Sequence, residues 1–313
     1  IPVSCATPAA ETRAAAPSGS ASHTHWAYLA ARRPQLPEID QPSRVANPVD
    51  SFVLARLRLG QRTFNPPAPP AVRLRRVTLD LIGLPPSLDE VDSFLADQRP
   101  DAWSRVVDRL LASPAYGEHW GRYWLDLARF ADTNGYNIDV RRPIWPYRDW
   151  VINALNTDLT YDQFTVEQIA GDLLPAATRA QRIATGFHRN TMINQEGGVD
   201  PEADRVKAIV DRVNTTATVW LGTTLACSHC HDHIYDPFTQ REFFAFYAFF
   251  NQTTDVAGGV PNSSLEPLLR VPSPEQQVEW DRLRSALANL AEGQTAAREK
   301  LRQAETALLK SMP

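Results

Sequence analysis

Proline is the sequence feature that most limits how this chain can fold. The 313 residues contain 25 prolines against 14 glycines, and a proline ends or kinks a helix and cannot donate a hydrogen bond within a sheet. Between the prolines, apolar residues recur at helical spacing, as in residues 73–83 and 116–131, whereas sustained apolar–polar alternation is almost absent. The sequence therefore predicts a mainly α fold, an irregular multi-helix domain with long Pro-rich connectors.

Composition divides the chain into four segments. Residues 1–23 are rich in Ala, Ser, Pro and Thr and predict a flexible lead-in, whereas residues 24–257 carry the helical pattern of the main domain. Residues 258–274 are rich in Gly, Pro and Ser and predict a linker. In residues 275–313 a heptad pattern predicts a C-terminal helix with a coiled-coil seam or, alternatively, a single helix on the body of the protein. The seam consists of Leu283, Leu287, Leu290, Gln294, Ala297, Leu301, Ala304 and Leu308.

Charge and hydropathy exclude two classes of function. The formal net charge is 32 − 36 = −4, so the chain lacks the basic excess of a nucleic-acid-binding protein. The longest apolar run is Phe243–Phe250, far shorter than the ~18 residues that a transmembrane helix needs. We therefore expect neither a nucleic-acid partner nor a transmembrane segment.

Two of the three cysteines stand in the sequence Cys227-Ser-His-Cys230-His231. Thiols at positions i and i+3 lie on one face of a helical turn, so both can form thioethers to the two vinyl groups of one haem. The adjacent histidine then reaches the iron. The spacing predicts one covalent haem c in residues 24–257, held by Cys227 and Cys230, with His231 as the proximal ligand.

Three other interpretations of the motif stay open. A zinc site would draw on Cys227, Cys230, His231 and His233, but zinc takes four ligands and the sequence shows no second CxxC. A redox CxxC would need a thioredoxin-like βαβ setting, which the pattern does not indicate. The third interpretation is a pair of buried thiols beside surface histidines.

The residue that provides the sixth iron ligand of such a haem also has to be identified. The chain has two methionines, and Met312 is close to the C-terminus, so Met192 is the thioether candidate. A lone methionine is more often core filler than a ligand. The histidine candidates are His188, His25 and His119. His233 follows the proximal position too closely to reach the distal face. The choice affects function because His/Met ligation raises the reduction potential.

Other side chains are candidates for contact with the haem. Propionates are negatively charged and favour guanidinium partners, and the candidates are Arg189, Arg205 and Arg212. A long helix predicted from Asp200 into the motif would place Trp220 on the Cys227 face. The aromatic run Phe243–Phe250 predicts core packing against the haem.

Several longer stretches follow one another in a fixed order: RRVTLDLIGLPP (75–86), YRDW (147–150), AGDLL (170–174), TGFHRNTMINQEGG (185–198), VDRVNTT (210–216) and CSHCHDHIYDP (227–237). Over residues 25–251 they resemble the planctomycete-type cytochrome domain DUF1549 (PSCyt2). The resemblance implies an exported bacterial c-type haem protein, because such haem is attached outside the cytoplasm. It also favours Met192 as the distal ligand, because the family's Gly-Phe-x-Arg-x-x-Met stretch includes that residue. The chain departs from the family at Ile234, where Lys is usual.

The resemblance also bears on location and on the end of the chain. It implies a periplasmic or other extracytoplasmic protein, and Cys5 in Pro-Val-Ser-Cys-Ala is then a candidate lipid anchor. Family members commonly continue past a helical linker into a second large domain, and the residues leading to Pro313 look like that linker.

Three functional hypotheses follow. The first is a mono-haem cytochrome that carries single electrons between redox proteins or other cytochromes. It would be a subunit of a larger complex, with a membrane-attached complex as one option, and would join it through residues 275–313. The second is a haem enzyme that acts on peroxide or a small substrate, with His188 or Glu196 as proton donor. The third is a haem-bearing scaffold subunit. The electron carrier is the leading hypothesis.

Overall fold

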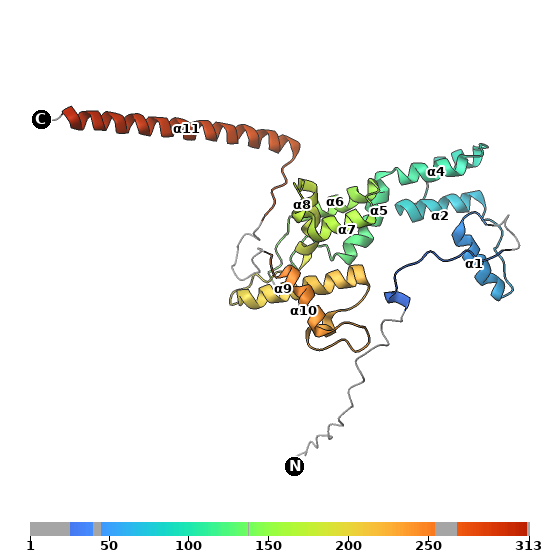
Figure 1. The fold of residues 1–313 in the computed structure, drawn as a ribbon. Helices are drawn as coiled ribbons and strands as arrows, with labels where there is room; N and C mark the ends of the chain where they lie inside the picture. The colour runs from blue at the N-terminus through green and yellow to red at the C-terminus, as the bar shows by residue number, and fades with distance from the viewer. Residues whose placement is uncertain (1–25, 40–44, 137, 254–267, 312–313) are drawn as a thin grey trace, which may run out of the picture. The chain divides into compact units, whose positions relative to one another are not determined.

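A computed structural model describes residues 26–39, 45–136, 138–253 and 268–311 (Figure 1). Within these ranges the chain is helical and has no β-strand, and an isolated bridge between Thr133 and Arg141 is its only β-type pairing. The prediction of a mainly α, irregular multi-helix fold is confirmed. Cys5, His25 and residues 258–267 of the predicted linker lie outside the described ranges.

Many α-helices of the described residues begin at or close to a proline. Their bounds are α1 (Pro48–Leu59), α2 (Pro70–Ile82), α3 (Leu88–Ala96), α4 (Ala102–Leu111), α5 (Pro114–Leu127), α6 (Trp145–Asn156), α7 (Tyr161–Ala170), α8 (Arg179–Ala184), α9 (Pro201–Thr216), α10 (Gln240–Phe250) and α11 (Pro274–Ser311). Short 3₁₀ turns cover Trp26–Tyr28, Gly171–Leu173, Thr185–Asn190 and Ala226–His229. Several helices begin with proline at the first position, where its missing N–H leaves no intrahelical bond unmade.

Local side chains fix where several helices begin. The side chain of Ser87 accepts a hydrogen bond from the N–H of Glu90, and the Glu90 carboxylate accepts one from the N–H of Ser87. This reciprocal capping box satisfies two N–H groups that the helix leaves unpaired. The same arrangement starts α1, α8 and α10, with the pairs Asn47/Asp50, Thr178/Gln181 and Thr239/Glu242.

The chain forms two compact units. The first comprises residues 1–128 and 209–253, and the second comprises residues 129–208 and 254–313. In the first unit, α2 packs against α3, α4 and α5. A second apolar cluster of the same unit joins the end of α9 to α10 and consists of Ile209, Val213, Ala217, Leu225, Phe243 and Phe250. The aromatic residues of α10 therefore divide between this core and the surface, since Phe249 is 77% exposed.

The second unit has an aromatic core made by α6, α7 and α8. The rings of Tyr147, Trp150 and Phe164 stack in sequence, with centroids 6.5 and 5.3 Å apart. The Tyr147 hydroxyl donates to Oε1 of the fully buried Gln168 at 2.7 Å. A Cβ on Gly186 would lie 2.8 Å from Cβ of Tyr147, so glycine is needed for the 3₁₀ turn to approach α6 this closely.

The prediction of one long helix from Asp200 into the cysteine motif is wrong. Helix α9 ends at Thr216, and a single π turn follows at Ala217–Leu221. Gly222 then adopts a left-handed conformation with φ of +63°, which glycine reaches without the steric cost of a Cβ. The motif is consequently a separate element and not the end of α9.

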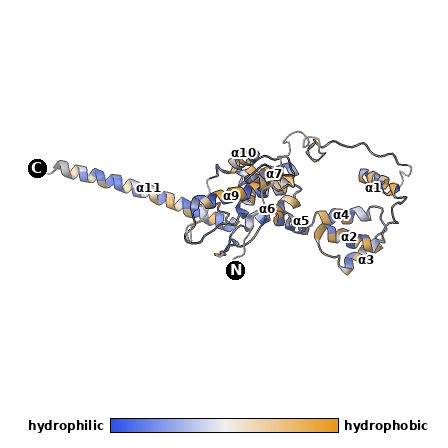
Figure 2. Ribbon diagram, turned by 90° about the horizontal axis from the view of Figure 1, so that it is seen from below, coloured by the Kyte–Doolittle hydropathy of each residue, from blue (hydrophilic) through white to orange (hydrophobic). Residues whose placement is uncertain are grey.

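The predicted C-terminal helix is confirmed as α11. Its described seam leucines, Leu283, Leu287, Leu290 and Leu301, are 52–72% exposed, and Figure 2 shows a largely hydrophilic helix with single apolar residues. The coiled-coil pairing stays a prediction. Neither α11 nor another helix in the described ranges is long and apolar enough to cross a membrane.

Candidate functional site

The segment from Cys227 to His231 forms a tight turn in the first unit. The N–H groups of Cys230 and His231 both donate to the carbonyl oxygen of Cys227, at 3.2 and 3.3 Å. Both cysteines are free thiols on the surface, and His231 is exposed as well. Ser228 between them is fully buried. The turn therefore presents two thiols and the His231 imidazole to solvent and buries its serine.

Hydrogen bonds to the start of α10 hold this turn in place. The Ser228 hydroxyl donates to the carbonyl oxygen of Phe238 at 3.3 Å. The N–H of Gln240 donates to the Asp232 carboxylate at 2.8 Å, and the Gln240 side-chain amide donates to the His229 carbonyl at 3.1 Å. Polar contacts thus fix the backbone on both sides of the second cysteine.

The orientation of His231 suits a metal ligand. Its Nδ1 lies 2.8 Å from the backbone carbonyl oxygen of Asp232. Because a carbonyl can only accept, Nδ1 carries the proton in this hydrogen bond, and the lone pair is then on Nε2. Histidines that bind metals commonly use the second ring nitrogen in this way.

The two neighbouring histidines, His229 and His233, make contacts that stabilise the local structure. Nδ1 of His233 accepts hydrogen bonds from the N–H groups of Tyr235 and Asp236, at 3.2 and 2.9 Å. The ring of His229 packs against Phe243, with the ring centroids 5.3 Å apart. In the described residues, no three His, Cys, Asp or Glu side chains gather as a metal site, so the four side chains of the zinc interpretation do not converge.

Met192 lies in the second unit and is not core filler. Its side chain is 55% exposed. Its Sδ lies against Gly135, where a Cβ would come within 2.9 Å of the sulfur, and Gly135 has φ of +84°. The Met192 sulfur is therefore accessible and could bind a metal, whereas the sulfur of a core methionine could not.

A buried asparagine holds the segment that carries Met192. Asn134 is 1% exposed. Its Oδ1 accepts from the N–H of Ile193 at 3.1 Å, and its Nδ2 donates to the Ile193 carbonyl. The side chain thereby pairs both backbone groups of the residue that follows Met192, in the manner of a strand partner.

We expect Asn134→Ala to destabilise the protein by about 1–3 kcal/mol, because it removes two partly buried hydrogen bonds and leaves backbone groups unpaired. The measurement is urea unfolding followed by circular dichroism. Asn153→Ala is the matched control, since Asn153 is exposed on α6 and surface changes usually stay within about 0.5 kcal/mol. Equal stability of the two variants would contradict the role of Asn134.

Comparison with protein families gives a match over residues 48–255 to a family described as PSCyt2, protein of unknown function (DUF1549). The chain belongs to the PSCyt2 family. This confirms the resemblance found in the sequence. The matched residues include Met192 and the Cys227–His231 turn, and α11 lies beyond them. No curated protein and no solved structure matches this PSCyt2 chain.

The other candidate residues of the PSCyt2 chain have defined surroundings. The guanidinium of Arg205 forms a two-pronged ion pair with Glu202, at 2.7 and 2.8 Å. Arg212 is buried in the first unit and donates to the Thr253 hydroxyl at 3.1 Å. These bonds compete with the predicted contact to a propionate. Arg189 is half-buried in the second unit.

The ring of Trp220 packs edge-on against Trp124, with centroids 5.5 Å apart. Because α9 ends before the motif, Trp220 does not share a helical face with Cys227. Contact of Trp220 with a haem stays a prediction, but the continuous helix from which it was predicted does not exist. His119 lies next to Trp120 and Tyr123, within 5.7 Å of each ring.

Near Met192 in the sequence, sequence reasoning missed two polar residues, Asn190 and Gln195, and named a third, Glu196, only as a proton donor. Asn190 and Gln195 are buried, and together with Glu196 they carry buried side-chain atoms that find no hydrogen-bond partner in the described part of the chain. Such groups are uncommon in folded proteins. No local sequence pattern marks them, because burial depends on the surrounding fold.

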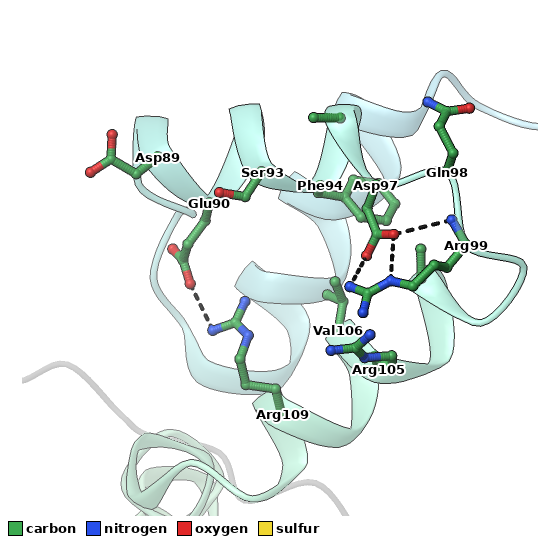
Figure 3. A pocket seen from close by; sticks show the side chains of 12 residues that line it. Asp89, Glu90, Ser93, Phe94, Asp97, Gln98, Arg99, Arg105, Val106 and Arg109 are labelled. Carbon is green, nitrogen blue, oxygen red and sulfur yellow. Dashed lines mark hydrogen bonds and ion pairs between the residues drawn. The ribbon is translucent and has the colours of Figure 1, made fainter.

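A hollow of about 750 Å³ lies between α3 and α4 (Figure 3). Figure 3 shows Arg109 directed at Glu90 and Arg99 at Asp97, with nitrogen–oxygen distances of 2.7 and 2.5 Å. Hydrogen bonds from Arg99 lower the pKa of Asp97 to about 2. These pairs neutralise much of the charge in the hollow, and we assign it no ligand.

Proposed function

We propose that this PSCyt2 chain is an exported c-type cytochrome with one covalent haem, and that it carries single electrons between redox partners. The observation that carries the proposal is the outward-facing turn, which presents Cys227, Cys230 and His231 together. The hydrogen bond from His231 Nδ1 to the Asp232 carbonyl supports it, because it leaves Nε2 available to iron.

The residues of the turn have distinct roles in this proposal. The Cys227 and Cys230 thiols would hold the haem through thioether bonds to its two vinyl groups, each thiol hydrogen passing to the other vinyl carbon. His231 Nε2 would bind its iron. The haem supplies the one-electron chemistry, and Asp232 keeps the imidazole oriented through its carbonyl.

Met192 is the proposed sixth ligand. Its exposed thioether supports this assignment. His188 is a weaker choice, because both of its ring nitrogens are shielded from solvent, and His25 lies outside the described residues. Ligation by His231 and Met192 would leave the iron no open position for peroxide, which favours electron transfer over the enzyme hypothesis.

Extracytoplasmic location is part of the proposal, because c-type haem is attached outside the cytoplasm. The direct test is production of the full chain in a host with a periplasmic system for c-type haem attachment. After denaturation and acid–acetone extraction, we expect about one pyridine haemochrome per chain, as the one CxxCH motif allows. A chain that carries no covalent haem after this treatment would end the proposal.

Helix α11 supports assembly into a larger complex. Its seam leucines are exposed in this chain, and a heptad seam is ordinarily covered by another helix. We expect deletion of residues 275–313 to lower the mass of the native assembly, measured by analytical ultracentrifugation, and to leave the haem spectrum unchanged. An unchanged assembly, or a changed spectrum, would contradict a role confined to docking. Removal of the exposed charge pair by Arg302→Gln is the control within α11.

A further inference from the structure

Helix α11 is tied to other parts of the chain by polar and aromatic contacts near its start. Arg179 of α8 donates to the Gln277 side chain at 3.0 Å, and the guanidinium carbon of Arg270 lies 5.1 Å from the centre of the Trp280 ring. Beyond Trp280, the hydrogen bonds and ion pairs of the described side chains of α11 are internal to the helix. Most of the helix is therefore available to a partner.

The apolar seam of α11 extends over four heptads, which gives each of its residues a heptad position. If Leu287 is an a residue, position a is filled by Trp280, Leu287, Gln294, Leu301 and Leu308, and position d by Leu283, Leu290, Ala297 and Ala304. The leucines of this seam that the structure describes are 52–72% exposed. Apolar a and d residues ordinarily pack against the seam of a second helix.

Charged residues on the two sides of the seam indicate which helix that is. Positions g and e flank a coiled-coil seam, and their charges select the partner and its direction. In a parallel pair, each g residue lies beside the e residue of the partner's next heptad. A second copy of α11 would thus place Glu279 beside Arg284 and Lys300 beside Glu305. The other two such pairs contain no like charges, so α11 is complementary to itself in parallel.

Most of these flanking charges have no partner within their own chain. Arg284, Lys300 and Glu305 form no ion pair with any residue that the structure describes. Glu279 differs, because it already pairs with Arg282 at 2.6 Å. The contact between Lys300 and Glu305 of two copies is consequently the clearest one to test, since it breaks no existing ion pair.

The polar residue in the seam also favours a parallel partner. In a parallel pair in register, Gln294 lies opposite its own copy, and the two side-chain amides can each donate and accept a hydrogen bond. In an antiparallel pair with full overlap of the seams, Gln294 would face Leu290 or Ala297, and Arg284 opposite Glu305 would be the flanking contact of opposite charge. A single polar a residue commonly specifies register in this way.

We propose that α11 pairs with α11 of a second copy of this chain, as a parallel coiled coil in register. The inference rests on the docking role of α11 in the proposed function and names the partner. It does not depend on the haem, because the seam and its flanking charges lie beyond the cysteine turn and beyond the matched family residues.

The first test is the mass of the purified full chain, measured by sedimentation equilibrium. We expect about twice the chain mass of 34.9 kDa, and a single chain after deletion of residues 275–313. A full chain that stays monomeric up to about 100 μM would overturn the proposal. If the deletion still lowered the mass of the native assembly, the docking role of α11 would stand and its self-pairing would fall.

Charge reversal tests the direction of the pair. Lys300→Glu and Glu305→Lys each place like charges on both sides of a parallel dimer, so each should weaken it about tenfold. An equal mixture of the two variants should regain the original affinity, because one side then pairs the two new charges and the other side the two original ones. Arg302→Glu is the matched control, since position 302 lies away from the seam, and it should leave the affinity unchanged.

An antiparallel dimer gives a different result. Position 305 would then face Arg284, whereas position 300 would face no charged residue. Glu305→Lys would therefore weaken the dimer and Lys300→Glu would not, and mixing would not restore the affinity. Either an unaffected Lys300→Glu variant or a mixture as weak as its components would overturn the parallel pairing.

Discussion

Replacing both Cys227 and Cys230 by alanine is expected to abolish covalent haem, from about one per chain to background. The two thiols are the sole anchors that the exposed turn offers, and an iron–histidine bond alone does not survive denaturation and acid extraction. The readout is haem staining after denaturing electrophoresis, together with the pyridine haemochrome of the precipitated protein.

The fold should withstand this change, which makes the result interpretable. Both cysteines are exposed, and surface substitutions usually alter stability by no more than about 0.5 kcal/mol. Each single variant should retain haem through one thioether and one unreacted vinyl group, with a red-shifted haemochrome band. Cys5→Ala is the control and should keep full attachment. Covalent haem in the double variant would require another anchor and would refute the role of the turn.

Replacing Met192 by alanine is expected to convert a closed haem into an open one. The oxidised protein should lose the long-wavelength charge-transfer band of a Met–iron bond, and the reduced protein should bind carbon monoxide rapidly. The reduction potential should fall, since a thioether ligand stabilises the ferrous state. These changes are measured by absorption spectroscopy and by redox titration.

Controls separate ligation from indirect damage. Met192 is more than half exposed, so its side chain contributes little to the core. Met192→His should restore a six-coordinate spectrum without the charge-transfer band and at a lower potential, whereas His188→Ala should resemble the parent protein. A His188→Ala variant that loses the band, with Met192→Ala unchanged, would transfer the assignment to His188.

Local sequence signals predicted much of this fold. The Ser87/Glu90 capping box and the glycine at the end of α2 act through neighbours within four residues, so the sequence alone shows them. Proline positions and apolar spacing likewise located the helices. The CxxCH spacing predicted the turn because its thiols and its histidine lie within five consecutive residues.

The features that sequence reasoning missed depend on distant contacts. Asn134 forms hydrogen bonds with Ile193, which is 59 positions away. No residue near Asn134 in the sequence indicates these bonds. From the sequence alone, Arg142 would be expected on the surface like most arginines, and only the structure shows that it is buried. The break after α9 was missed for another reason: the apolar pattern continues through Gly222, and the left-handed conformation that stops the helix is tolerated by glycine but not signalled by it.

The contacts that shape the cysteine turn have a consequence for the order in which the protein matures. The hydrogen bonds from Ser228 and Gln240 span 8 to 11 residues, and closing a loop of about 10 residues takes only tens of nanoseconds. Segments with such low contact order acquire native geometry early. We therefore expect residues 227–240 to assume their shape before distant helices pack, so that the proposed haem attachment would precede completion of the fold.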